Sequence, residues 1–162
     1  MESSDGVRSI APADTPALVA LAEGTGVFKP AELVALREVL DDYHAANAAL
    51  AHRAIALVAN ERLVGFAYFA PAAMTDRNWN LWWIAVARDA QGRGAGRRLM
   101  AWVESAIVEA RGRCLLIETS SLDHYGPTRA FYEQLGYRQV AAVPDFYADG
   151  DHLCIFSKRL GP

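Results

Sequence analysis

The chain has 162 residues, 52% of them apolar and 22% charged, which is the composition of an ordinary globular protein and is long enough to bury a core. Its formal net charge of −3 gives no reason to expect a nucleic acid or a membrane surface as a partner. No apolar run reaches the roughly 18 residues of a membrane-spanning helix. Residues 1–15 lack the pattern of a secretory signal, so we expect a cytoplasmic protein.

The N-terminal part of the chain predicts one short strand and two helices. The strand is expected at 7–10 and the first helix over 11–24, ending on a glycine. The second helix is expected over 29–45, because Pro30 suits a first helical turn and leucines then recur every three or four residues. The loop between the two helices, GTGVFK, carries one large apolar residue, Phe28.

The pattern then changes to that of strands. Two apolar runs, 53–59 and 62–71, flank Asn60 and Glu61, which predicts a tight hairpin. A third strand is expected at 78–87, where aromatic and branched residues dominate. These three strands predict the first part of a sheet.

The C-terminal part predicts two more helices and three more strands. The helix that follows the glycine-rich segment is expected to stop at Gly112, and a buried strand follows at 113–120. A short helix is expected over 127–136, and two last strands surround a turn at Asp149 and Gly150.

The order of these elements, β-α-α-β-β-β-α-β-α-β-β, predicts an α/β (α+β) fold. We expect one domain over 1–162, with its core at about 7–160. Its central sheet is expected to be mixed and largely antiparallel, flanked by helices, with one parallel crossover through the helix that follows the glycines.

The segment between the third strand and that helix, RDAQGRGAGRRL, has glycines at 92, 94 and 96. It lacks the Gly-Lys-Ser/Thr of a phosphate loop, and it fails the dinucleotide fingerprint because Arg97 stands at the sixth position. Glycines before a helix still suit a pyrophosphate, since the unpaired N–H groups and the helix dipole favour an anion and no Cβ blocks its approach. A plain strand-to-helix turn is the alternative.

Two blocks of sequence resemble the GNAT N-acyltransferase superfamily. The first, VARDAQGRGAGRRLM, resembles its acyl-CoA loop, whose motif Gln/Arg-x-x-Gly-x-Gly/Ala is met by Gln91, Gly94 and Gly96. The second, TRAFYEQLGYRQV, resembles a later helix and strand of the family. One position departs: many members carry asparagine seven residues before the helix tyrosine, where this chain has Tyr125. The resemblance covers most of the chain and implies the acyl-CoA N-acyltransferase fold.

The resemblance also implies a donor site for acetyl-CoA as cosubstrate, without a metal. The strand backbone at Ile84, Ala85 and Val86 would pair with the pantetheine arm, and an N–H near Val86 would polarise the thioester carbonyl. Backbone N–H groups of the glycine loop would hold the pyrophosphate. The donor-binding residues implied in this loop are Gln91, Gly92, Arg93, Gly94, Ala95, Gly96 and Arg97.

The reaction implied is direct transfer of an acetyl group from acetyl-CoA to a primary amine of a small molecule or peptide. Tyr132 matches the tyrosine that acts as general acid in the family; a core aromatic is the alternative. Glu118 is the candidate base, acting through a water, and an end-of-strand carboxylate bonded to nearby amides is its alternative. Asp145, His124 and Asp76 compete for the role of base.

The resemblance places the acceptor site at the loop between the first two helices and at the last hairpin. Phe28, Asp145 and Tyr147 would form an apolar slot with an acidic rim; ordinary loop anchors are the alternative. Exposed strands can pair in a homodimer, which the sequence neither requires nor excludes. A non-catalytic acyl-CoA-binding or sensing module and a nucleotide-binding regulatory domain remain as competing functions.

Overall fold

The computed structural model describes residues 5–162, which fall into two compact units. The first unit holds residues 5–70 and Trp83–Val103, and the second holds Pro71–Trp82 and Glu104–Pro162. Seven strands are described: β1 (Gly6–Ser9), β2 (Arg53–Ala59), β3 (Arg62–Pro71), β4 (Asn78–Val86), β5 (Cys114–Ser120), β6 (Arg138–Ala148) and β7 (Asp151–Arg159). The four α-helices described are α1 (Thr15–Thr25), α2 (Pro30–Ala45), α3 (Ala95–Glu109) and α4 (Gly126–Gln134), and short 3-10 turns occur at Pro12–Asp14, Asn47–Leu50, Arg88–Ala90 and Asp123–Tyr125.

The strands follow the order β1-β2-β3-β4-β5-β7-β6, and both β4 and α3 contribute residues to each unit. β4 and β5 are parallel, with Asn78 opposite Cys114, whereas β1–β2, β2–β3, β5–β7 and β6–β7 are antiparallel. The predicted fold class, a mixed and largely antiparallel sheet with flanking helices, is therefore confirmed.

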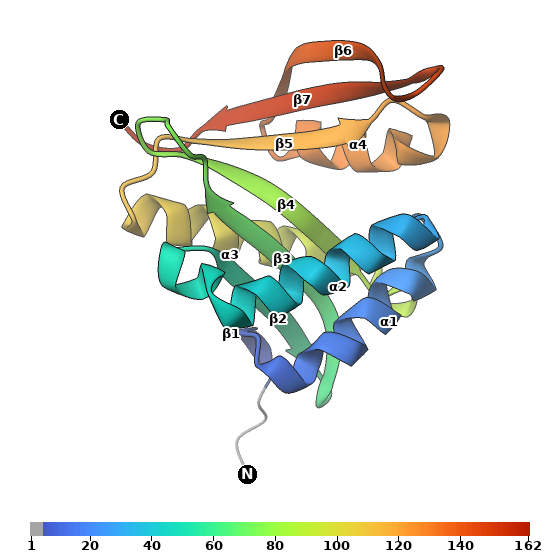
Figure 1. Cartoon of the computed structure of the whole chain (residues 1–162), viewed down its shortest axis with the longest axis vertical. Coiled ribbons are helices and arrows are strands. Elements are labelled where there is room, and N and C mark those ends of the chain that lie inside the picture. The colour runs from blue at the N-terminus through green and yellow to red at the C-terminus, as the bar shows by residue number, and fades with distance from the viewer. Residues whose placement is uncertain (1–4) are drawn as a thin grey trace. The chain divides into compact units, whose positions relative to one another are not determined.

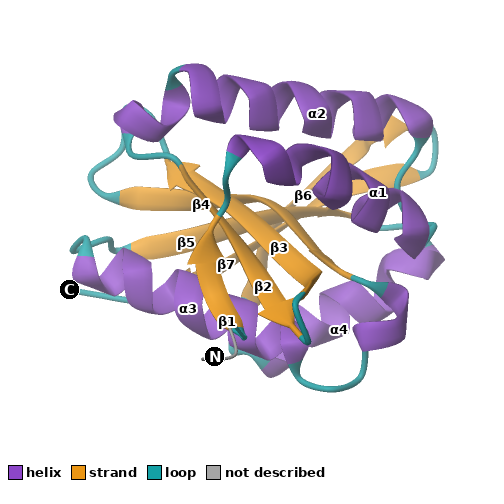
Figure 2. Cartoon of the chain, turned by 90° about the horizontal axis from the view of Figure 1, so that it is seen from below, coloured by secondary structure: helices purple, strands orange, loops and turns teal. Residues whose placement is uncertain are grey.

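In the first unit, α1 and α2 cover one face of the strands (Figures 1 and 2). Their leucines at three- and four-residue steps point into the core, where Leu18, Leu36 and Leu40 have no exposed surface. Burial of each such side chain contributes roughly 1.5–3 kcal/mol. Strand residues complete this core: Ala54, Ala56, Phe66, Tyr68, Ala70 and Ala85.

The turns of the first unit confirm one prediction and correct another. Asn60 and Glu61 both have positive φ, 50° and 60°, as a two-residue hairpin turn requires. The first helix does not end at Gly24 as predicted: it continues to Thr25, and Gly26 ends it with a left-handed φ of 75°. Gly24 is an exposed helical residue, so the second glycine, not the first, provides the stop.

In the second unit, β7 lies between β5 and β6, and α4 packs on β7 through Tyr132 and Phe156. Every residue of β6 is exposed. Gly112 follows α3 as predicted, and its N–H donates to the Ile107 carbonyl at 2.8 Å where the helix ends. The left-handed residue there is Arg111, with φ 60°, and glycine at 112 is needed for close packing. A Cβ there would clash with Ile107 Cγ2 and would lie 2.8 Å from Trp79 Cδ1.

Candidate functional site

The predicted donor loop begins with a closed turn in the first unit. Ala87 donates its backbone N–H to the Val64 carbonyl at 2.8 Å, which fixes the end of β4. The Gln91 side-chain amide donates to the Val86 carbonyl at 3.0 Å. Gln91 therefore closes the turn from 86 to 91, and its amide is directed at the protein backbone.

The glycines of the loop adopt conformations that favour glycine. Gly92 has φ 75° and Gly94 has φ 81°, and a Cβ at either position would meet nothing within 4 Å. Packing therefore does not require glycine at these positions. The backbone conformation does, and the absence of a side chain leaves the peptide groups open to a ligand.

The loop leads directly into the N-terminus of α3. The first hydrogen bond of the helix is from the Arg98 N–H to the Gly94 carbonyl at 3.0 Å. The N–H groups of Ala95, Gly96 and Arg97 precede it, so they have no carbonyl of their own helix to bond. No acidic residue lies in the first turn, and Arg93, Arg97 and Arg98 are exposed around it. The loop thus fits a pyrophosphate in backbone conformation, in free donors and in charge.

The loop between α1 and α2 carries Phe28, the predicted acceptor residue of the first unit. Its ring lies 5.6 Å from the ring of Trp83 on β4, next to Ile84 in sequence. Phe28 is half-buried against the hydrophobic core of this unit. Arg88 also reaches this region, because its guanidinium donates to the Thr25 carbonyl at 3.0 Å.

Tyr132 lies on α4 in the second unit and is only 3% exposed. Its ring centroid is 6.1 Å from those of both Tyr137 and Phe156. Burial raises the pKa of the Tyr132 phenol, so the group stays protonated around neutral pH. Within residues 5–162, no hydrogen bond of its hydroxyl is found. The hydroxyl therefore carries a proton that no protein group engages, although its raised pKa makes it a weaker acid than an exposed tyrosine.

Glu118 is the exposed residue of β5, opposite Ile155 of β7. Among the residues described, its carboxylate has no hydrogen bond or ion pair, so the alternative of a carboxylate bonded to nearby amides receives no support. Asp76 differs, because Arg77 donates to it at 3.0 Å and lowers the pKa of that carboxyl. His124 is exposed, with its ring 4.5 Å from that of Tyr125.

Asp145 has a structural role in the hairpin of β6 and β7. Its carboxylate accepts the Gly150 N–H at 2.8 Å, and its own N–H donates to His152 Nδ1 at 2.8 Å. With a positive φ of 54°, Asp145 begins an outward bulge of β6. The bulge presents Phe146 and Tyr147, 57% and 44% exposed, with their rings 5.1 Å apart.

The predicted site residues are thus distributed over both units. The first unit brings together the donor-loop residues, the end of β4 and Phe28, and the second contains Tyr132, Glu118, Asp145 and Tyr147. Sequence reasoning missed Arg88 and His152, whose partners are distant in sequence or lie across a bulge. No periodicity or motif signals such contacts.

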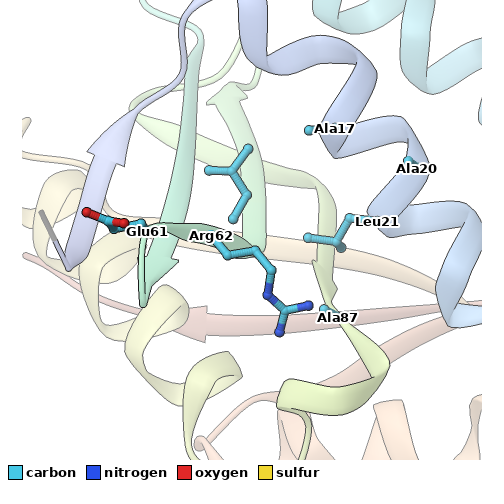
Figure 3. A pocket seen from close by; sticks show the side chains of 7 residues that line it. Ala17, Ala20, Leu21, Glu61, Arg62 and Ala87 are labelled. Atoms are coloured by element: carbon cyan, nitrogen blue, oxygen red, sulfur yellow. The ribbon is translucent and has the colours of Figure 1, made fainter.

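An open pocket of about 500 Å³ lies on the first unit, beside the turn that opens the donor loop (Figure 3). It is lined by Ala17, Ala20, Leu21, Glu61, Arg62, Leu63 and Ala87. None of these is a predicted site residue, but Ala87 directly follows Val86 at the end of β4, and Arg62 forms an ion pair with Asp89 of the turn at 2.9 Å. No helix in the described part of the chain is both long and apolar enough to cross a membrane.

Comparisons with known proteins agree with the loop geometry. A family model described as an acetyltransferase (GNAT) domain matches residues 52–139. A structure assigned to the GNAT family from Desulfovibrio desulfuricans shares 31% identity, with a TM-score of 0.93 over 98% of this chain and 100% of that one. No curated protein matches the sequence.

Two further solved structures share the fold at low identity. The ribosomal-protein-S18-alanine N-acetyltransferase of Escherichia coli is 17% identical, with a TM-score of 0.80 over 98% of this chain and 95% of that one. A Salmonella typhimurium structure described with its cofactor acetyl-CoA is also 17% identical, with a TM-score of 0.78 over the same shares. The family match over more than half of the chain and the 31% identity to a full-length neighbour show that this chain belongs to the GNAT acetyltransferase family.

Proposed function

We propose that the protein transfers an acetyl group from acetyl-CoA to a primary amine of a small molecule or peptide. The observation that carries the proposal is the open glycine loop at the N-terminus of α3, with left-handed Gly92 and Gly94 and free N–H groups beyond them. The acetyl-CoA named with the Salmonella neighbour supports the choice of donor.

The donor is held by backbone groups in this proposal. The N–H groups from Gly92 to Arg97 bind the diphosphate, with the three arginines of this region supplying positive charge. The β4 backbone at Ile84 and Ala85 pairs with the pantetheine arm. The Val86 carbonyl already accepts a hydrogen bond from the Gln91 side chain. The Val86 N–H is therefore the group that polarises the thioester carbonyl.

Bound acetyl-CoA supplies the thioester carbonyl that the acceptor amine attacks, so that a C–N bond forms and the C–S bond breaks. Glu118 takes the proton of the amine through a water, because its carboxylate is exposed and uncommitted. Tyr132 gives its proton to the leaving thiolate. Each residue thus moves one proton in the transfer.

The acceptor contacts in the proposal are Phe28 of the first unit and Tyr147 of the second. Asp145 lies two residues before Tyr147 in the hairpin of β6 and β7. Because Asp145 already accepts the Gly150 N–H, it acts on the acceptor chiefly by fixing the bulge that presents Tyr147. The carboxylate adds negative charge that suits a protonated amine.

Calorimetric titration with acetyl-CoA, ATP and NAD tests the donor. We expect acetyl-CoA to bind and the other two not to. Gly94→Ala adds a Cβ in open space at a left-handed position, so it costs about 1–2 kcal/mol of stability but weakens acetyl-CoA binding at least tenfold. Gly150→Ala is the matched control: its φ is 79°, nothing lies within 4 Å of its Cβ, and acetyl-CoA affinity stays unchanged.

A thiol-release screen with polyamines, amino acids, aminoglycosides and peptides tests the transfer. Turnover with one amine class supports the enzyme. Binding of acetyl-CoA without turnover on any amine would favour the non-catalytic binding module, and preferential binding of ATP or NAD would refute the donor assignment.

A further inference from the structure

The turn that opens the donor loop is tied to the end of α1 by a long-range side-chain contact. Arg88 Nη2 donates to the Thr25 carbonyl at 3.0 Å, across 63 positions of sequence and in a partly buried place. A positive charge at the C-terminal end of α1 interacts favourably with the helix dipole and with its free carbonyls. The contact is therefore a favourable and specific one.

The absence of a side chain at Gly26 leaves space for the Arg88 guanidinium. A Cβ at Gly26 would lie 2.8 Å from Arg88 Nη2. Gly26 also has φ 75°, and its N–H donates to the Glu23 carbonyl at 3.1 Å as the helix ends. Gly26 is thus favoured by the left-handed backbone turn, and a side chain there would displace the Arg88 guanidinium.

The two segments joined by Arg88 are each closed by their own hydrogen bonds. On the α1 side, the Thr25 hydroxyl donates to the Ala22 carbonyl at 2.6 Å and accepts the Val27 N–H at 3.4 Å. On the loop side, Ala90 donates to Ala87 at 2.8 Å, and Gln91 closes the turn onto Val86. The Arg88 side chain therefore links two segments that are each held by their own hydrogen bonds.

We infer that Arg88 is a positioning residue that couples the donor-binding segment, 91–97, to the acceptor loop, 24–29. The inference rests on the proposed function, because it takes these two loops as the places where donor and acceptor bind. When a donor orders the loop at 91–97, Arg88 holds the Thr25 carbonyl in place and orders the segment that carries Phe28. Donor binding thereby prepares the acceptor loop.

Hydrogen exchange with and without coenzyme A tests this inference. In the wild-type protein, coenzyme A slows exchange at 91–97 and also at 24–29. Arg88→Met keeps the apolar stem and removes the donor, so exchange at 24–29 no longer responds while protection at 91–97 remains. Arg88→Lys restores part of the response. Coenzyme A affinity stays within about threefold in both variants.

Arg62→Ala is the matched control, because it breaks the exposed ion pair of Arg62 with Asp89 (2.9 Å) on the same loop and leaves Thr25 untouched. In Arg62→Ala, coenzyme A should still slow hydrogen exchange at 24–29. A response of 24–29 in Arg88→Met equal to that of the wild type would overturn the coupling, as would a wild-type protein that protects 91–97 alone. Absence of protection at 91–97 in the wild type would instead refute the proposed donor site. Should Arg88→Met not fold, the comparison of Arg88→Lys with Arg62→Ala decides.

Discussion

The substitution Tyr132→Phe distinguishes the proposed catalytic role of the Tyr132 hydroxyl from the packing role of its ring. The ring is 3% exposed and packs against Tyr137 and Phe156, contacts that phenylalanine retains. The hydroxyl has no hydrogen bond among the residues described, so its removal leaves no partner unsatisfied. We therefore expect the free energy of unfolding to change by less than about 0.5 kcal/mol.

The expected effect on turnover is much larger. A positioned general acid contributes about 10²–10⁴ to the rate, so kcat in Tyr132→Phe falls at least about a hundredfold, which corresponds to about 2.7 kcal/mol. Acetyl-CoA affinity changes by less than about threefold, because the hydroxyl acts on the leaving thiolate. Burial raises the pKa of Tyr132, so deprotonation of this residue causes no loss of rate between pH 7 and about 9.

Tyr137→Phe is the control for this experiment. Tyr137 is 2% exposed, and its hydroxyl donates to Glu104 at 3.3 Å, so its loss costs about 1 kcal/mol of stability but no turnover. Urea denaturation measures the first quantity, and thiol release measures the second with the amine found in the screen. Unchanged kcat in Tyr132→Phe would remove the residue from the mechanism. A stability loss above about 2 kcal/mol would show that the hydroxyl has a structural partner.

Two further predictions concern stability. Gly112→Ala brings a Cβ into a clash with Ile107 Cγ2, so urea denaturation should show a loss of about 1–3 kcal/mol in the free energy of unfolding. Gly24→Ala, in open space within α1, should instead gain about 0.5–1 kcal/mol. Equal effects of the two substitutions would contradict the packing role of Gly112. Burial lowers the pKa of His52, whose Nδ1 lies 2.6 Å from the Tyr68 hydroxyl, below its usual 6.5. As the pH drops, the unfolded chain protonates His52 before the folded protein does, so the free energy of unfolding falls as the pH drops through about 6.5. Denaturation measured between pH 8 and 5 should therefore show a smaller loss of stability in His52→Gln than in the wild-type protein.

The parts of the fold that local patterns determine could be predicted from the sequence. Pro30 starts α2 and the turn at Asn60 and Glu61 closes a hairpin, because each depends on residues within a few positions. The predicted end of α1 is wrong by one residue, since Gly24 and Gly26 look alike locally. The position of Arg88, 62 residues after Gly26, distinguishes them in the folded chain.

In the candidate site, too, features that depend on neighbouring residues could be predicted from the sequence, and features that depend on distant residues could not. The donor loop is a contiguous motif, so its position can be predicted from the sequence. Its proposed function needs more than the glycines: the second block, TRAFYEQLGYRQV, makes the family resemblance specific. The structural role of Asp145 depends on His152 and Gly150, which meet it only when β6 and β7 pair. The roles of Tyr132 and Glu118 stay predictions, because they concern reacting groups rather than the protein's own contacts.

The bulge in β6 has a consequence for how this scaffold can be altered. Pairing stops after Val143 and resumes at Ala148, whereas β7 has only His152 between the two partners. Residues 144, 146 and 147 can therefore be exchanged without shifting the register of β7, whose Leu153 and Phe156 are buried, provided that Asp145 keeps its hydrogen bonds to Gly150 and His152. The bulge is therefore a position where other side chains for recognition can be introduced while the rest of the second unit folds as before.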